Sequence, residues 1–193
     1  LNESSFDFSG GGGFTMSTWA RVDAFDTSWQ ALVAKGEGSE FRVARRGGGS
    51  EMSFVAGSGG DTPAGGPAVN DGDFHHIVAV HGGGTTNQLW VDGVLIHDVA
   101  RGDVVDNNQP LMIGENPDAQ AREWEGQIDD MAFWNRPLTA EEIGQIFQGG
   151  QDGQSLGDLI APQQVVPEPA IIDVWLMIGA LGGLFACRRY RKR

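Results

Sequence analysis

Cysteine is almost absent from this chain: Cys187 is the single one among 193 residues. Residues 1–165 therefore cannot form a disulfide, and an apolar core alone has to hold them together. The same absence excludes a cysteine nucleophile there, and no Ser-His-Asp arrangement can be argued from the order of the residues. Roughly 150 residues are enough to build one such core.

Basic residues are scarce as well, with 13 Lys and Arg against 26 Asp and Glu. They are also unevenly placed. Residues 1–165 hold 24 acidic and 8 basic side chains, a net charge of −16, whereas residues 166–193 carry a net charge of +3. The acidic part argues against nucleic acid or an anionic membrane as its partner. It is compatible with solubility and with the binding of divalent cations.

Helical periodicity is rare before residue 139. This part of the chain consists of short segments in which apolar and polar residues alternate, separated by Gly, Asp, Asn and Pro. The pattern is typical of antiparallel β proteins and excludes a parallel α/β sheet, which needs helices between its strands. We predict an all-β, antiparallel jelly-roll β-sandwich. Its expected strands are residues 14–22, 29–35, 41–45, 52–56, 74–81, 89–91, 94–96, 111–114 and 127–134.

Two local patterns add detail to this outline. Asp92-Gly93 between two apolar runs favours a two-residue type I′ hairpin. Residues 139–142 (Thr-Ala-Glu-Glu) form a capping box, apolar residues follow at helical spacing, and Gly149-Gly150 ends the run, so we predict one short helix. The polar, proline-containing residues 151–165 are predicted to be a flexible linker.

The longest apolar run lies near the end of the chain, at residues 170–187. At helical rise this run spans about 27 Å, close to the thickness of a bilayer core, so we predict a single transmembrane helix. Val166, Pro167, Glu168 and Pro169 precede the run, and the basic cluster after it contains Arg188, Arg189, Arg191, Lys192 and Arg193. By the positive-inside rule the cluster is cytoplasmic, and residues 1–165 face outward.

Together these three parts, residues 166–193, resemble the PEP-CTERM sorting tail of Gram-negative bacterial surface proteins. The resemblance implies an exported protein that the inner membrane holds until an exosortase cuts it near Pro167-Glu168-Pro169. The product would then belong to the cell surface or the extracellular matrix. A permanent membrane anchor is the alternative. Because no signal sequence follows Leu1, we expect residues to be missing upstream.

Four motifs resemble those of one family. Residues 14–19 look like its opening strand, residues 71–80 (DGDFHHIVAV) like its DGxWHHVA strand, residues 89–94 (LWVDGV) like its LYVDGV hairpin and residues 124–138 like its FxGxIDDVRIYNRAL ending. The chain is thus similar to the LamG-like jellyroll domains, which are concanavalin A-like lectin/glucanase sandwiches. The resemblance places this domain at residues 1–150 and implies that the first strand of the family is missing.

The fold hosts both glycoside hydrolases and binding modules, so it does not decide between them. A retaining glycosidase needs two carboxylates about 5–5.5 Å apart, and the Glu-x-Asp-x-x-Glu spacing of laminarinase-type relatives does not occur here. Asp129 and Asp130 are adjacent on a predicted strand and are expected to point to opposite sides, as are His75 and His76. We therefore predict no enzymatic activity, and a packing role for the two histidines.

The resemblance also implies one structural Ca²⁺, held by Asp side chains and backbone carbonyls. Either Asp129 or Asp130 is the candidate ligand, since Ca²⁺ prefers oxygen donors. The alternative, of equal weight, is that one of the two aspartates caps a turn and the other is solvated.

Aromatic side chains bind sugars through their faces, and Trp29 and Trp124, near predicted loop boundaries, are the candidates for exposed ones. We predict a carbohydrate-binding module at the cell surface. A protein-binding or purely structural component with the same fold remains a second hypothesis, and a hydrolase with an unrecognised site a third.

Overall fold

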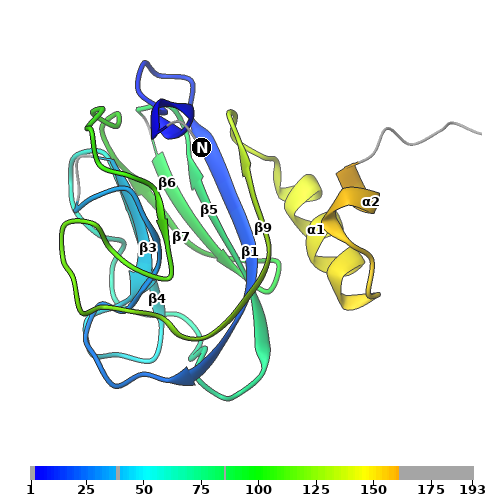
Figure 1. Cartoon of the computed structure of the whole chain (residues 1–193). Helices are drawn as coiled ribbons and strands as arrows, with labels where there is room; N and C mark the ends of the chain where they lie inside the picture. The colour runs from blue at the N-terminus through cyan, green and yellow to red at the C-terminus, as the bar shows by residue number, and fades with distance from the viewer. Residues whose placement is uncertain (1–2, 38–39, 85, 161–193) are drawn as a thin grey trace, which may run out of the picture. The chain divides into compact units, whose positions relative to one another are not determined.

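The computed structural model describes residues 3–37, 40–84 and 86–160, which form two antiparallel β-sheets that face each other (Figure 1). The five-stranded sheet has the order β7-β6-β5-β1-β9, and the four-stranded sheet has the order β4-β3-β2-β8. The strands are β1 (Phe14–Ala24), β2 (Ala31–Ala34), β3 (Phe41–Arg45), β4 (Met52–Ala56), β5 (Phe74–His81), β6 (Thr86–Val91), β7 (Val94–Ala100), β8 (Met112–Ile113) and β9 (Glu125–Trp134). The predicted antiparallel β-sandwich is therefore confirmed.

The main core lies between the two sheets. Alternate residues of β1 enter it, as the sequence pattern predicted: Phe14, Met16, Ala20 and Val22 are all buried there. Phe41, Val43 and Phe54 face them from the other sheet. Burying side chains of this size contributes about 1.5–3 kcal/mol each to stability, which allows the domain to fold without a disulfide.

The hairpin between β6 and β7 has the predicted turn. Asp92 and Gly93 both have positive φ angles, 50° and 74°, and Val91 pairs directly with Val94. Positive φ at both central residues is the signature of a type I′ turn, which matches the twist of the flanking strands.

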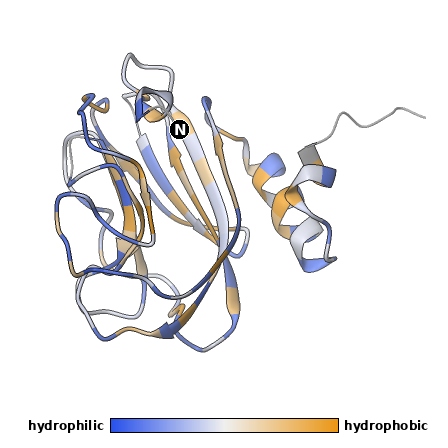
Figure 2. Ribbon diagram, viewed as in Figure 1, coloured by the Kyte–Doolittle hydropathy of each residue, from blue (hydrophilic) through white to orange (hydrophobic). Residues whose placement is uncertain are grey.

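A second, smaller apolar layer covers the outer face of the five-stranded sheet. Helix α1 (Ala140–Gln151) starts at the predicted capping box, in which the Thr139 side chain accepts a hydrogen bond from the Glu142 backbone N–H. Its buried residues Ile143 and Ile146 pack against the sheet residues Val78, Val80 and Trp90. Figure 1 shows α1 on the side of this sheet away from β3 and β4, and Figure 2 shows the apolar residues along the helix.

The first part of the predicted flexible linker is ordered, which corrects the boundary at residue 150. Helix α1 extends to Gln151, and a short helix α2 (Leu156–Ile160) follows. Leu156 is buried in the outer apolar layer, and Gly149 of α1 is in close contact with Leu159. The missed signal is this pair of leucines, since apolar residues that find a surface to cover order the backbone around them.

No helix among residues 3–37, 40–84 and 86–160 is long and apolar enough to cross a membrane. The predicted span at residues 170–187, the sorting motif and the basic cluster lie outside the described residues. A 3₁₀ turn (η1, Glu3–Phe6) opens the described part of the chain.

Candidate functional site

Strand β9 carries a bulge where it pairs with β1. Ser17 pairs with Ala132 and Trp19 pairs with Asp129, so residues 130 and 131 together face the single residue Thr18. Asp130 adopts a positive φ of 46°, and its backbone N–H donates to Asp129 Oδ1 at 2.9 Å. A bulge with an extra residue in this conformation turns the following side chains relative to the regular pleat.

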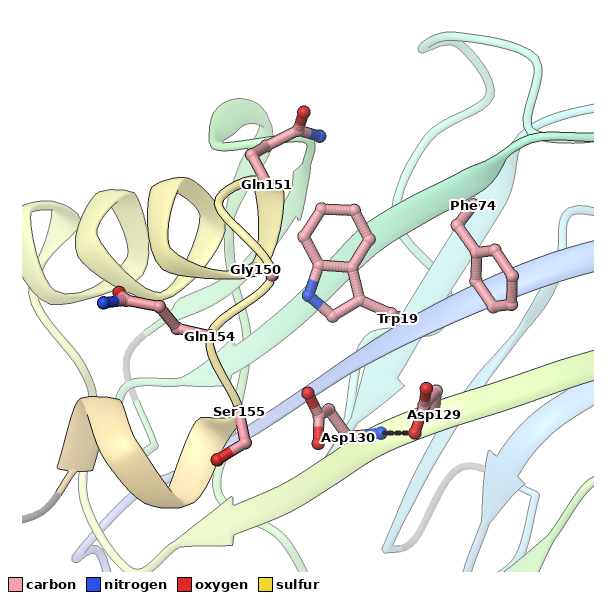
Figure 3. Close-up of a pocket in the computed structure, with 9 residues that line it drawn as sticks. Trp19, Phe74, Asp129, Asp130, Gly150, Gln151, Gln154 and Ser155 are labelled. Carbon is pink, nitrogen blue, oxygen red and sulfur yellow. Dashed lines mark hydrogen bonds between the residues drawn. The ribbon is translucent and has the colours of Figure 1, made fainter.

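The bulge overturns the expectation that Asp129 and Asp130 point to opposite sides. Both line the same pocket, and Figure 3 shows the two carboxylates on one side of β9. The error has a physical cause: the alternation of side chains holds for a regular strand, and an inserted residue breaks it. Opposite orientation therefore does not prevent Asp129 and Asp130 from acting as a carboxylate pair.

The pocket lies on the outer face of the five-stranded sheet, beside the end of α1, and has a volume of about 600 Å³. Strands β1, β5 and β9 supply one wall, and the end of α1 with the turn after it supplies the other (Figure 3). Its lining residues are Trp19, Phe74, Asp129, Asp130, Gly150, Gln151, Gly153, Gln154 and Ser155. It thus combines two aromatic rings, two carboxylates and two amide side chains.

Trp19 is held in place by its neighbours on one side. Its ring stacks on Phe147 of α1, with 5.8 Å between ring centroids and 18° between ring planes. The Trp19 and His76 ring centroids are 5.2 Å apart. Gly150 allows the helix to approach, because a Cβ at this position would lie 2.5 Å from Trp19 Nε1. The indole orientation is therefore fixed by packing before any ligand arrives.

Phe74 provides the second aromatic surface and is 38% exposed. The Arg21 guanidinium lies 5.7 Å from its ring centroid and forms an ion pair with Asp23 at 2.9 Å. Arg21 is directly opposite Phe74 in the sheet, but it does not line the pocket. The lining residues therefore carry negative charge and no Lys or Arg.

The two histidines of β5 point to opposite sides, as predicted, and both are packed. His76 lies fully buried behind Trp19, where its Nε2 is 2.8 Å from Ser17 Oγ, and burial lowers its pKa to about 4. His75 is hydrogen-bonded to Asp92 at 2.7 Å and to Asp71 at 3.0 Å. Burial works to lower the pKa of His75, but these two carboxylates outweigh it and raise the pKa above the usual value. The geometry agrees with a packing role for both.

The aromatic residues that sequence reasoning singled out are not those in the pocket. Trp124 is only 9% exposed and belongs to the main core, which corrects its prediction as an exposed residue. Trp29 is half-buried and lies under the guanidinium groups of Arg42 and Arg46. Trp19 was missed because it sits at a regular strand position, where packing in a core is the default interpretation. The alternation along the strand could have identified it, because Trp19 lies on the opposite face of the strand from the core residues Met16 and Ala20.

A group of carboxylates that could act as metal ligands lies outside the pocket. In the described part of the chain, carboxylate oxygens of Glu3, Asp7 and Asp106 lie within 4.8 Å of one another. Asp129 and Asp130 are not part of this group.

A two-layer antiparallel sandwich of this kind is a lectin-like fold. The chain belongs to the concanavalin A-like lectin/glucanases superfamily, which residues 1–144 match. A search of curated proteins finds no match.

Solved structures support the same fold. The binding domain of Paraclostridial Mosquitocidal Protein 1 is 18% identical with a TM-score of 0.59, over 76% of this chain and 39% of that one. Trypanosoma rangeli sialidase is 17% identical with a TM-score of 0.56, and the match covers 73% of this chain and 23% of the sialidase chain. A botulinum neurotoxin type C structure, described with the dependence of cell entry on two ganglioside molecules, is 10% identical with a TM-score of 0.55, over 73% and 36%. This chain thus spans less than half the length of each, and at these identities the likeness is one of fold.

Proposed function

We propose that residues 1–150 act as a carbohydrate-binding module without hydrolytic activity. The observation that carries this proposal is that Trp19, Phe74, Asp129 and Asp130 line one pocket together. Aromatic faces pack against the C–H faces of sugar rings, and carboxylates accept hydrogen bonds from sugar hydroxyls. The amides of Gln151 and Gln154 add donors and acceptors. The superfamily and the toxin binding domains of the same fold support this direction.

The charge of the pocket narrows the class of sugar. Two carboxylates and no Lys or Arg line it, within a domain of strongly negative net charge. An acidic sugar would meet like charges, which disfavours its binding. We therefore expect neutral sugars or amino sugars, with the protonated amine of the latter placed near Asp129 or Asp130.

The hydrolase alternative is kept because the bulge brings both aspartates into one pocket. Glycoside hydrolysis needs one carboxyl group as an acid and the other as a nucleophile or base, at a fixed separation across the scissile bond. In this pocket Asp129 instead accepts a hydrogen bond from the backbone of its neighbour Asp130. This use of the Asp129 carboxylate supports a binding role.

A glycan array on the full chain, with neutral, amino and acidic oligosaccharides, tests the binding proposal. We expect neutral or amino sugars to bind, and Phe74→Ala and Asp129→Asn to weaken binding at least tenfold, which corresponds to about 1.4 kcal/mol. Ile113→Ala is the matched control. Ile113 is 56% exposed and lies on β8 of the other sheet, so this substitution should leave sugar binding unchanged.

Three results would redirect the proposal. Sugar binding that is insensitive to Phe74 and Asp129 would place the binding site elsewhere. An absence of binding to every glycan would favour the protein-binding or structural hypothesis. Release of reducing sugar by the wild-type chain that Asp130→Asn abolishes would establish the hydrolase instead.

The tail supports a second proposal, that an exosortase processes the exported chain. Its support is the order of the sequence features: Val166, Pro167, Glu168 and Pro169, then residues 170–187, then the five basic residues up to Arg193. We expect the surface-localised protein in a host with this machinery to lack the basic cluster, and Glu168→Ala to retain it. Mass spectrometry of both proteins measures this directly. A wild-type surface protein that still ends at Arg193 would show a permanent anchor.

A further inference from the structure

Helix α1 adds to the negative charge of the pocket. Asp129 and Asp130 of β9 line one side of it. Gly150 and Gln151, at the C-terminal end of α1, line the other side (Figure 3). The aligned peptide dipoles of a helix place about −0.5 elementary charge at its C-terminus. The last turn of α1 contains no basic residue that would offset this charge, so two carboxylates and a helix end make the same cavity negative.

The Asp130 carboxylate has no partner in the part of the chain that the structure describes. The backbone N–H of Asp130 donates to Asp129 Oδ1, but no described residue forms a hydrogen bond or an ion pair with the Asp130 side chain. Asp130 is exposed, so water can solvate its carboxylate. A ligand cation can replace this water without breaking a bond within the protein.

The basic groups beside the pocket do not neutralise it. Arg21 forms an ion pair with Asp23 at 2.9 Å and is not among the lining residues. His76 lies behind Trp19, and burial lowers its pKa to about 4, so its ring is uncharged near neutral pH. The two pocket aspartates therefore attract a positively charged ligand without competition from a charged side chain in the pocket.

Aromatic rings favour the same kind of ligand. Trp19 and Phe74 line the pocket together with the two aspartates. The face of a Trp or Phe ring attracts a cation that lies within about 6 Å of the ring centroid. The same face also packs against the apolar face of a sugar ring. Rings and carboxylates around one cavity thus suit a ligand that carries both a sugar ring and a positive charge.

The size of the cavity excludes a small cation as the whole ligand. Its volume of about 600 Å³ lies within the range of about 300–1,000 Å³ that is typical of small-molecule sites. A lysine side chain or a metal ion would fill only a small part of it. A ring-sized ligand that bears an ammonium group matches both the volume and the charge.

We infer that the pocket prefers amino sugars with a free, protonated amine, such as glucosamine units, over neutral sugars and N-acetylated amino sugars. This inference rests on the proposed function, because it specifies the ligand of the same pocket. The ammonium group is expected beside Asp129 and Asp130, with the sugar ring against Trp19 or Phe74. N-acetylation replaces the ammonium with a neutral amide, which loses the attraction to the carboxylates and to the end of α1.

Calorimetric titration of the full chain with three tetrasaccharides tests the inference. Equally linked tetramers of glucose, glucosamine and N-acetylglucosamine differ in one substituent of each ring: a hydroxyl, an ammonium and an acetamido group. At mildly acidic pH, where the amine is protonated, we expect the glucosamine tetramer to bind about tenfold tighter than either neutral tetramer. In about 1 M NaCl, where the screening length is about 3 Å, this preference should shrink.

Asp130→Asn tests which group recognises the amine. Asn tolerates the positive φ of 46° at this position, so the variant should keep the bulge. We expect the preference for the glucosamine tetramer to fall below about threefold, while binding of the glucose tetramer stays within about twofold of the wild type. Asp98→Asn is the matched control. It removes an equal charge from an exposed aspartate on β7, at the opposite edge of the same sheet, and should keep the preference.

The outcomes separate this inference from the proposed function. Equal affinity for the three tetramers, or sugar binding confined to other glycans, would overturn the inference alone. An absence of binding to every tetramer and to every glycan of the array would overturn the proposed function as well. A glucosamine preference that Asp129→Asn and Asp130→Asn both retain would place amine recognition outside the pocket. Tetralysine that binds as tightly as the glucosamine tetramer would show that the pocket selects charge without the sugar ring.

Discussion

The sugar pocket and the charged group around Lys35 each contain more carboxylates than cations, yet their surroundings differ. We call this second group, which consists of Lys35 with Glu3, Asp7, Glu40 and Asp106, the Lys35 cluster. In the pocket, Asp129 and Asp130 are exposed beside the rings of Trp19 and Phe74. In the cluster, Glu40 is completely buried and its carboxylate faces other carboxylates. Water can solvate the first pair and leaves it free to accept hydrogen bonds from a ligand. The second group lacks this solvation and depends on the buried Lys35 ammonium to offset its charge.

The two sites also differ in how the chain builds them. The sheet half of the pocket depends on a local irregularity, the bulge of β9 at Asp130. The cluster depends on tertiary contacts among segments as far apart as Glu3 and Asp106. Changes in the cluster should therefore affect the stability of the whole domain, whereas changes in the pocket should mainly affect binding.

The largest effect is expected for Lys35→Met. Removal of the ammonium leaves four carboxylates without their buried cation, and loss of one partner of a buried ion pair typically costs about 3–5 kcal/mol. Denaturant unfolding measures this loss of unfolding free energy. Arg21→Met is the control beside the pocket, because its ion pair with Asp23 is partly exposed and worth at most about 1 kcal/mol. Equal losses of unfolding free energy for the two variants would show that the buried and the exposed ion pairs contribute equally to stability.

The next effect concerns the pH dependence of stability and His76, whose ring contacts the pocket residue Trp19. His76 has a pKa of about 4 in the folded domain, below the ordinary value of 6.5, because burial disfavours its charged form. The unfolded chain therefore binds more protons between these values, and stability should fall as the pH drops from about 6.5 to 4. The loss should approach about 3 kcal/mol. His76→Gln should flatten this part of the stability–pH curve. An unchanged slope would mean that His76 is solvated.

A smaller effect is expected where α1 meets Trp19. Gly150→Ala places a methyl group 2.5 Å from Trp19 Nε1, and overpacking of this kind costs about 1–3 kcal/mol. It should also weaken sugar binding, because the indole has to move. Gly144→Ala on the same helix meets nothing within 4 Å and should stabilise the domain by about 0.5–1 kcal/mol. Thermal melts and glycan titrations of the two variants separate helix propensity from pocket packing.

The smallest effect is expected at the bulge itself. Asp130 has a φ of 46°, a conformation that glycine adopts freely and alanine does not. Asp130→Gly should thus change stability by less than about 0.5 kcal/mol, whereas Asp130→Ala should cost about 1 kcal/mol. Both should weaken sugar binding, which glycan titrations of the two variants measure. Equal stability losses for Asp130→Gly and Asp130→Ala would contradict this account of the bulge.

The sequence alone determined the features that depend on neighbours along the chain. Alternation in residues 14–22 predicted which side chains enter the core, Asp92-Gly93 predicted the type I′ turn, and the Thr139 capping box predicted α1. Each of these follows from backbone geometry within a few residues. The jellyroll motifs similarly indicated the superfamily that the comparison confirms.

Only the tertiary structure decided the features that depend on pairing between distant segments. The bulge at Asp130 arises where β9 pairs with β1, so the sequence of β9 alone did not reveal it. Trp19 became a pocket residue and Trp124 a core residue because of what packs against each. Helix α2 is ordered by its contacts with the outer layer. The Lys35 cluster has no local pattern, since proximity among residues 3, 7, 35, 40 and 106 exists only after the chain has folded.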